Sequence, residues 1–363
     1  RGHSNVQGDR TMGIWERPSQ AFLDRLEATF DFTPPQAHGA DVVAAIQRML
    51  DRPGAVFFAL GGNFLSATPD TEATARALRQ CRLTVQVSTK LNRAHLVTGQ
   101  AAVILPCLGR TERDVQAGGL QFVTVENSMG VVHQSQGGLT PASEHLRAEP
   151  WIVAELAARL VGPQEPIDWR EAVGDYDRVR AYIEKAIPGF DDYNARVRRA
   201  GGFYLPNPAR EGRFNTPDGK AQFKVHALPQ RTLAPDELVM MTVRSHDQYN
   251  TTIYGLDDRY RGVRGERRVV FVHPDDLAAR GLKGGDVVDL VGSHDGGARV
   301  AERFVTVPFD VPRGACATYF PEANVLVPLH HKAKRSHTPA SKWVPIRLRP
   351  SADGRRADPE RVA

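Results

Sequence analysis

The feature that most constrains the fold is an alternation of short apolar runs with amphipathic segments in the first half of the chain. Helical spacing of apolar residues predicts helices over Gln20–Phe32 and Ala40–Leu50. The continuous apolar run Ala55–Leu60 predicts a strand buried on both faces. Because strands that alternate with helices form a parallel sheet with helices on its faces, residues 19–187 predict an α/β domain.

The pattern predicts further elements in this domain. They are a capped helix from Thr68-Pro69-Asp70 to about Gln80, strands over Leu83–Val87, Ala101–Leu105 and Gln121–Val125, a short helix over Leu91–Val97, and helices over Trp151–Leu160 and Asp168–Ile187.

The character of the chain changes after this domain. Residues 188–235 are rich in Gly, Pro, Asn and Arg, and we expect a surface connector there. Residues 236–350 predict a mostly β domain, a barrel rather than an open sheet, and 351–363 a disordered polar tail. The strands are expected at Leu238–Thr242, Arg268–Val272, Asp286–Val291, Ala298–Val307 and Trp343–Leu348.

Length and composition fit a protein of two globular domains. The chain has 363 residues, and its apolar content of 41% and charged content of 25% are ordinary. No apolar run approaches the roughly 18 residues that cross a bilayer. Its three cysteines are far apart, which excludes a disulfide framework or a self-contained iron–sulfur or zinc site and favours a cytoplasmic location. The net charge of +5 is spread along the chain, which favours an anionic small ligand over nucleic acid.

The first thirteen residues have no helical or strand period. They are dense in donors, acceptors and glycines, from Arg1 and His3 through Gly8 to Gly13. A segment of this kind gains little from burial, so we expect it to bind something. We also expect the chain to be the C-terminal part of a larger protein.

Polar residues follow the predicted parallel strands. Gly61-Gly62-Asn63 ends the first strand, and Ser88-Thr89-Lys90 ends the second. Ligands bind outside the carboxyl ends of such strands, where glycine amides and the N-terminus of the helix near Pro69 attract phosphate. The alternative for the glycines is a tight turn, and for Lys90 a solvated surface lysine.

Further carboxylates and polar loops are candidate ligand contacts. Glu126-Asn127 and Glu149 lie where a doubly wound fold reads a nucleotide, although the commoner explanation for Glu149 is an acid favoured at a helix start. The loop from Thr242 to Thr252 is more polar than a structural loop requires, unless it satisfies its own backbone. A second polar cluster runs from Pro321 to Lys342; its adjacent histidines, His330 and His331, cannot easily face one metal ion. We find no Ser-His-Asp or Cys-His signature of a hydrolase.

Five of these segments, in this order, resemble the C-terminal half of the molybdopterin oxidoreductases. The segments are the opening Arg-Gly-His-Ser-Asn-Val-Gln-Gly-Asp-Arg, the Gly-Gly-Asn-Phe loop, Val103-Ile104-Leu105-Pro106, Thr242-Val243-Arg244 with the loop after it, and Asn324 with Ser341-Lys342. The similarity covers nearly all of residues 1–350. It is greatest to the formate-dehydrogenase-like alpha subunits.

The resemblance implies a bis(molybdopterin guanine dinucleotide) enzyme with molybdenum and a 4Fe–4S cluster. The fold of that family implies that residues 19–187 are a partial doubly wound parallel-sheet domain that binds a dinucleotide. It implies that residues 236–350 are a six-stranded double-psi β-barrel that binds molybdopterin dinucleotide. The cluster cysteines and the molybdenum ligand would then lie upstream of residue 1. The implied activity is two-electron oxidation of formate or a similar small substrate, with electrons passed to an acceptor protein or subunit.

The resemblance also implies that residues 1–18 are an active-site loop, and it assigns roles residue by residue. Arg1 matches the arginine that holds the substrate anion, and His3 lies where formate dehydrogenases usually have Gln, which puts formate itself in doubt. The implied cofactor contacts are Gly62, Asn63, Ala67, Ser88, Lys90, Glu149, Thr242, Arg244, Ser245, Asn250, Thr251, Asn324 and Lys342.

Two other functions compete with this one. The first is a non-catalytic electron-transfer or scaffold subunit of the same fold. The second is a simple nucleotide-binding α/β protein joined to a small barrel. The polar barrel loops and Arg1 favour the enzyme, because a scaffold has no use for them.

Overall fold

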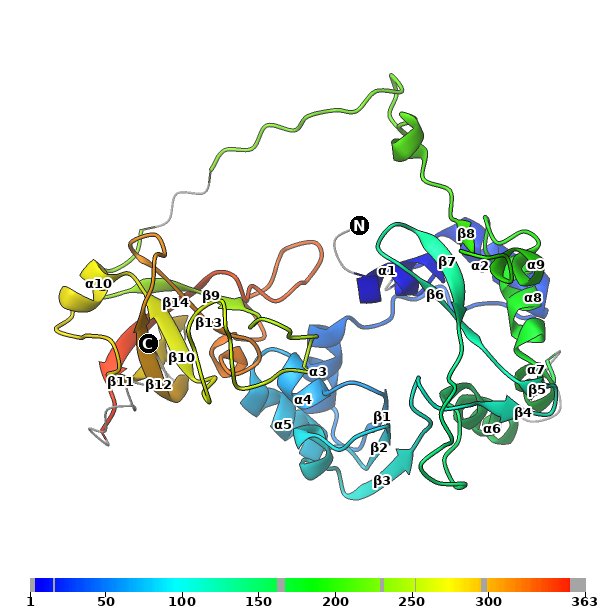
Figure 1. The fold of residues 1–363 in the computed structure, drawn as a ribbon, viewed down its shortest axis with the longest axis horizontal. Coiled ribbons are helices and arrows are strands. Elements are labelled where there is room, and N and C mark those ends of the chain that lie inside the picture. The colour runs from blue at the N-terminus through cyan, green and yellow to red at the C-terminus, as the bar shows by residue number, and fades with distance from the viewer. Residues whose placement is uncertain are drawn as a thin grey trace. The chain divides into compact units, whose positions relative to one another are not determined.

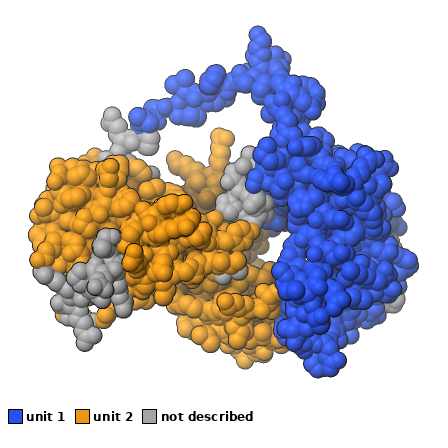
Figure 2. All heavy atoms as spheres, viewed as in Figure 1, with its two compact units in different colours: residues 1–39, 106–228 blue, residues 40–105, 229–363 orange. Residues whose placement is uncertain are grey.

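A computed structural model describes residues 4–15, 17–161, 167–228, 232–251, 253–294 and 299–352. The chain divides into two compact units, coloured separately in Figure 2. Unit 1 comprises residues 1–39 and 106–228, and unit 2 comprises residues 40–105 and 229–363. The arginine and histidine expected to touch substrate, Arg1 and His3, lie outside the described residues, as does the predicted tail beyond residue 352.

This division differs from the one expected along the chain. Residues 40–105, the first part of the predicted α/β domain, group with the barrel, whereas residues 106–187 belong to the other unit. Sequence order alone does not reveal which segments pack together, because long-range contacts decide it.

The α/β part of unit 2 is a three-stranded sheet of order β1-β2-β3 (Figure 1). Strands β1 (Val56–Leu60) and β2 (Leu83–Ser88) pair in parallel, and β3 (Ala101–Pro106) follows β2. Helices α3 (Val42–Asp51) and α5 (Thr71–Arg79) pack on the face that carries Phe57. The short helices α4 (Phe64–Ala67) and η1 (Arg93–Leu96) follow β1 and β2.

The other face of β1 is open in the described chain. Val56, Phe58 and Leu60 are 54%, 36% and 50% exposed. The expectation of a strand buried on both faces was therefore wrong for this chain. A continuous apolar run shows that both faces are apolar, but not that the same chain supplies a cover for each.

The second part of unit 2 is a closed six-stranded barrel of order β10-β12-β11-β14-β9-β13. β10 and β12, and β9 and β13, pair in parallel, whereas β11 is antiparallel to β12 and β14. The strands are β9 (Leu238–Val243), β10 (Val269–Val272), β11 (Val287–Gly292), β12 (Val300–Pro308), β13 (Ala315–Tyr319) and β14 (Val344–Pro350). The prediction of an α/β fold followed by a barrel is confirmed, with β13 as a strand that it missed.

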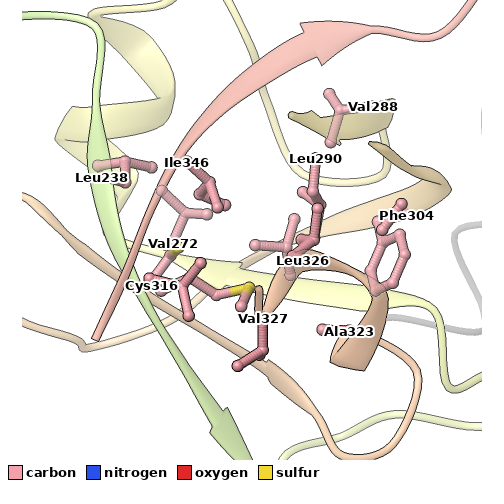
Figure 3. Close-up of a cluster of buried hydrophobic side chains, with 14 of the residues drawn as sticks. Leu238, Val272, Val288, Leu290, Phe304, Cys316, Ala323, Leu326, Val327 and Ile346 are labelled. Atoms are coloured by element: carbon pink, nitrogen blue, oxygen red, sulfur yellow. The ribbon is translucent and has the colours of Figure 1, made fainter. Parts of the chain in front are cut away.

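Apolar side chains from all parts of the barrel fill its interior (Figure 3). Leu238, Leu290 and Ile346 are fully buried, and Leu326 from the short helix η4 (Asn324–Leu326) joins them. Helix α10 (Pro274–Ala278) adds Leu277 to the same cluster. This packing gives the barrel a rigid wall from which its loops extend.

A buried carboxylate stabilises the long loop between β9 and β10. Asp258 is 1% exposed and accepts hydrogen bonds from the Tyr319 hydroxyl at 2.8 Å and from Arg261 Nη1 at 2.6 Å. Burial favours the neutral acid, but these two bonds outweigh it and lower the pKa of Asp258.

Unit 1 is built from helices around two small sheets. Its helices are α1 (Ser4–Thr11), α2 (Gln20–Phe30), α6 (Glu149–Leu160), α7 (Trp169–Gly174), α8 (Tyr176–Ala186), α9 (Tyr193–Val197) and η2 (Pro208–Glu211). One sheet is the antiparallel set β6 (Val123–Glu126), β7 (Val131–Ser135) and β8 (Phe203–Tyr204); the other pairs β4 (Val115–Gln116) with β5 (Gly119–Leu120). The segment Gln121–Val125 was expected to be a fourth strand of the parallel sheet, and this was wrong: β6 pairs antiparallel with β7.

Part of the predicted surface connector lies in the core of unit 1. Phe190, Tyr193 and Phe203 are buried, and their ring centroids lie 4.6 to 6.0 Å apart. The expectation of a surface segment was therefore wrong for residues 188–205. Three aromatic rings supply enough apolar area for a core even in a segment rich in glycine and proline.

The opening run forms a helix rather than a loop. Gln7 and Thr11, one turn apart in α1, both bond to the Glu126 carboxylate of β6, at 2.5 Å each, and Gln7 also donates to Asn127 O at 2.9 Å. The helix was missed because its packed face is polar, and a search for apolar periodicity does not detect it. Among the described residues, no helix is long and apolar enough to cross a membrane.

Candidate functional site

The predicted cofactor contacts concentrate in one unit. All of them except Glu149 belong to unit 2, and five come from the α/β part and seven from the barrel. Those of the α/β part are Gly62, Asn63, Ala67, Ser88 and Lys90; those of the barrel are Thr242, Arg244, Ser245, Asn250, Thr251, Asn324 and Lys342. The loops after β1 and β2 and the loops of the barrel, far apart in the sequence, therefore share a single compact unit.

The loop after β1 has the properties of a ligand-binding turn. Gly61 and Gly62 have φ angles of 69° and 76°, which L side chains rarely adopt, and a Cβ built on Gly62 would meet no atom within 4 Å. Asn63 is 7% exposed, and within the described residues its Oδ1 atom has no hydrogen-bond partner. A buried acceptor without a donor is costly unless a ligand supplies one.

The loop after β2 is held close to the glycine loop. Ser88 Oγ lies 3.2 Å from His95 Nε2, and Asn92 Nδ2 donates to Gly62 O at 2.9 Å. Asn92 also caps η1 through a bond from Ala94 N at 2.9 Å. The side chain of Lys90 is exposed. The two strand ends that the sequence singled out are thus joined directly, by Asn92, which the sequence analysis did not identify.

The glycine-loop segment is fastened to the barrel by a set of three residues, which we call the Asp70 clasp: Asp70, Arg299 and Asn324. Asn324 Nδ2 donates to Ser66 O at 2.8 Å and to Thr68 O at 3.3 Å. Asn324 O accepts from Asp70 N at 3.1 Å, and Arg299 Nη2 donates to Asp70 Oδ2 at 2.6 Å. The clasp fixes the orientation of the glycine loop relative to the barrel.

The clasp changes two sequence-based interpretations. Helix α5 was expected to start near Pro69 and to offer its positive end to a phosphate; instead Asp70 is the N-cap and bonds to Ala73 N at 3.2 Å, so that end is already capped. The amide of Asn324, expected to contact cofactor, is engaged with two backbone carbonyls. The contact of Asn324 with the cofactor stays a prediction.

The polar loop after β9 is internally braced. Arg244 Nη2 donates to Asn250 Oδ1 at 2.5 Å, and Ser245 N donates to Gln248 Oε1 at 2.9 Å. Thr251 is buried, at 8% exposure. Gln248, which the sequence analysis left without a role, donates back to Asn250 O at 2.8 Å and to Phe320 O at 2.6 Å.

The cation Lys342 is bonded to the base of this loop, and the charge of a second cation, Arg244, acts on it. The Lys342 ammonium donates to the carbonyl of Thr242, and Thr242 N donates to Ser341 O at 2.9 Å. Partial burial and the neighbouring Arg244 guanidinium both lower the pKa of Lys342. A pair of cations that repel each other is suited to an anion, which would relieve the repulsion.

Glu149 lies in unit 1, as the first residue of α6. Burial, then the charges of Glu149 and Glu112, raise the pKa of Cys107 to about 11. The position of Glu149 at the start of α6 agrees with its interpretation as a helix-start acid. Its predicted contact with guanine stays untested.

Comparison with known proteins places this geometry in a family. Residues 238–345, nearly the whole barrel, match the family described as "Molydopterin dinucleotide binding domain". The chain is 54% identical over 358 residues to an uncharacterised oxidoreductase of Mycobacterium tuberculosis (strain ATCC 25618 / H37Rv), covering 97% of this chain and 46% of that protein. It is 45% identical over 361 residues to protein YdeP of Escherichia coli (strain K12), covering 97% and 47%.

Two more distant proteins also match this chain, one in sequence and one in structure. A nitrate reductase of Shewanella frigidimarina (strain NCIMB 400) is 24% identical over 312 residues, which cover 77% of this chain and 32% of that protein. The structure of acetylene hydratase from Pelobacter acetylenicus superimposes with a TM-score of 0.61 over 94% of this chain and 50% of that one, at 14% identity, which shows the fold alone.

The barrel is a molybdopterin dinucleotide-binding domain. The chain belongs to the molybdopterin oxidoreductase family and corresponds to its C-terminal region. It spans about half the length of the mycobacterial oxidoreductase and of protein YdeP.

Proposed function

We propose that this chain is the cofactor-positioning part of a molybdenum oxidoreductase that carries bis(molybdopterin guanine dinucleotide). The substrate is formate or a similarly small molecule, and the reaction is a two-electron oxidation. A 4Fe–4S cluster in the remaining part of the enzyme, a cytoplasmic location and an electron-acceptor protein or subunit complete the proposal.

The buried, unsatisfied Oδ1 of Asn63 carries the proposal. It lies beside two glycines with positive φ angles, and a Cβ on Gly62 would meet open space, so the loop fits a ligand that offers an N–H group and a phosphate. A pterin guanine dinucleotide has both. The cations of Arg244 and Lys342, in the same unit, suit its pyrophosphate.

The chain's own residues bind and orient rather than react. Glycine amides and the Asn63 acceptor would hold one part of the dinucleotide, and the loop after β9 another. The bound molybdenum centre would supply the electron-transfer chemistry. Arg1 would hold the carboxylate of the substrate as a charge-assisted, two-point contact, and His3 would set the hydrogen bonding beside it.

The decisive experiment is to purify the full-length gene product from molybdate-replete cells and to measure molybdenum and guanine nucleotide by mass spectrometry. Both are expected, near stoichiometry with the protein. Absence of both would overturn the proposal.

A second experiment separates the enzyme from a non-catalytic subunit of the same fold. In the full-length enzyme, Arg1→Ala is expected to abolish turnover while molybdenum and guanine nucleotide stay bound. Unchanged turnover would favour the scaffold.

A further inference from the structure

Arg267, which the sequence did not single out, is a buried arginine that bonds to the polar loop 244–251 after β9. It lies just before β10 and is 4% exposed. Its Nε and Nη2 atoms donate to Glu322 Oε1 at 2.6 Å and Oε2 at 3.1 Å, a two-point ion pair. The guanidinium also lies over the rings of Tyr254 and Tyr319, at 4.3 and 4.9 Å from their centroids.

The same guanidinium reaches the loop after β9. Its Nη1 donates to Ser245 Oγ at 2.7 Å, and its Nη2 donates to Gln248 Oε1 at 3.1 Å and to Phe320 O at 2.9 Å. Arg267 thereby joins the loop to the segment after β13 that carries Glu322. Each of the three guanidinium nitrogens donates at least one hydrogen bond of 2.6 to 2.9 Å, so the side chain is fixed rather than merely buried.

The loop needs this support because its backbone is strained. Asp247 and Asn250 have φ angles of 59° and 49°, a region that non-glycine residues rarely occupy. Residues persist there only when surrounding contacts hold them. Gln248, between them, is held on its oxygen by Arg267 and on its nitrogen by Asn250 O and Phe320 O.

We propose that Arg267 and Glu322 are positioning residues that hold loop 244–251 in its cofactor-binding conformation and so set the affinity for the dinucleotide. They act through Ser245 and Gln248, and the loop residues Arg244 and Asn250 then present their side chains in a fixed geometry. The inference rests on the proposed function for the identity of the ligand. The ordering of loop 244–251 by Arg267 and Glu322 does not depend on that function.

The test compares the full-length protein with Arg267→Lys, Glu322→Gln and the matched control Arg268→Lys, which alters the exposed neighbour of Arg267. Lysine keeps the charge but cannot make the two-point contact. Hydrogen exchange of the peptide covering 244–251, exchange of the barrel strands, and guanine nucleotide content are measured for each.

Arg267→Lys and Glu322→Gln are expected to speed exchange in 244–251 by about tenfold, as for loss of a hydrogen bond to a charged group, with the strands unchanged. Both are expected to lower nucleotide occupancy, and the double variant to behave like either single one, because the pair acts as a unit. Arg268→Lys is expected to match the unaltered protein.

Three results would overturn the inference: lower occupancy with unchanged loop exchange, faster exchange throughout the barrel, or a loosened loop with full occupancy. If Arg267→Lys does not fold, Glu322→Gln, which changes one atom, gives the same readouts. If the unaltered protein contains no guanine nucleotide, the proposed function fails. In that case unchanged loop exchange in the variants would separately reject the positioning role.

Discussion

Replacing Asn324 tests whether this side chain fastens the glycine loop or contacts the cofactor. Its amide is 3% exposed and bonds to the carbonyls of Ser66 and Thr68, both in buried residues. Asn324→Ala removes two hydrogen bonds, each contributing about 1 kcal/mol net, and leaves two buried acceptors with little access to water. Since an unsatisfied buried acceptor adds a further penalty, we expect unit 2 to lose about 2–4 kcal/mol of unfolding free energy.

The assay is urea unfolding of the 363-residue chain, followed by hydrogen exchange in peptides from β1, α5 and β9. Lys334→Ala, an exposed change in the same unit, is the control and is expected to stay within about 0.5 kcal/mol. The α5 peptides are expected to lose protection first, because the clasp holds that helix. A stability loss below about 0.5 kcal/mol, with reduced guanine nucleotide in the full-length protein, would refute the reasoning and show that Asn324 acts on the cofactor directly.

Three further predictions follow from individual contacts. Glu126→Ala should release helix α1 and raise hydrogen exchange in residues 4–11, at a cost of about 1–2 kcal/mol for two lost hydrogen bonds. Asp258→Asn should flatten the acid unfolding curve of the barrel. Folding lowers the pKa of Asp258, so its carboxylate stabilises the folded state above the unfolded pKa of about 3.9. That stabilisation is lost as the pH falls through the pKa of the folded state. Cys107 should resist iodoacetamide at pH 8, since a pKa of about 11 leaves roughly a thousandth as thiolate.

Each of these three predictions has its own control. Glu126→Ala should leave exchange in β12 unchanged; equal loosening there would contradict a local role. An acid midpoint for Asp258→Asn identical to that of the unaltered chain would contradict the assigned carboxylate. Full alkylation of native Cys107 within minutes, compared with the urea-unfolded chain as control, would contradict its burial.

The candidate site was predictable where residue type alone limits the chemistry. Gly61-Gly62-Asn63 could be found because a glycine pair after an apolar strand signals a turn that side chains cannot adopt, and the structure confirms the φ angles. Arg267 and Gln248 could not be found, because nothing in the sequence distinguishes a buried arginine from the many exposed ones. The segment Thr68-Pro69-Asp70 signalled a helix start, with the cap expected before Pro69, whereas the structure makes Asp70 the N-cap. The ion pair of Asp70 with Arg299 joins residues 229 apart in the chain.

The sequence by itself determined most helices and strands of unit 2, the change from α/β to barrel and the polar loops that follow the strands, because these depend on local periodicity and on residues near in the chain. Only the tertiary structure decided that residues 40–105 belong with the barrel, that a polar helix at Ser4–Thr11 packs through Glu126, and that the Asp70 clasp joins the glycine loop to the barrel. These outcomes depend on contacts between distant segments. The free energy of such contacts cannot be predicted from the residue pattern of either segment alone.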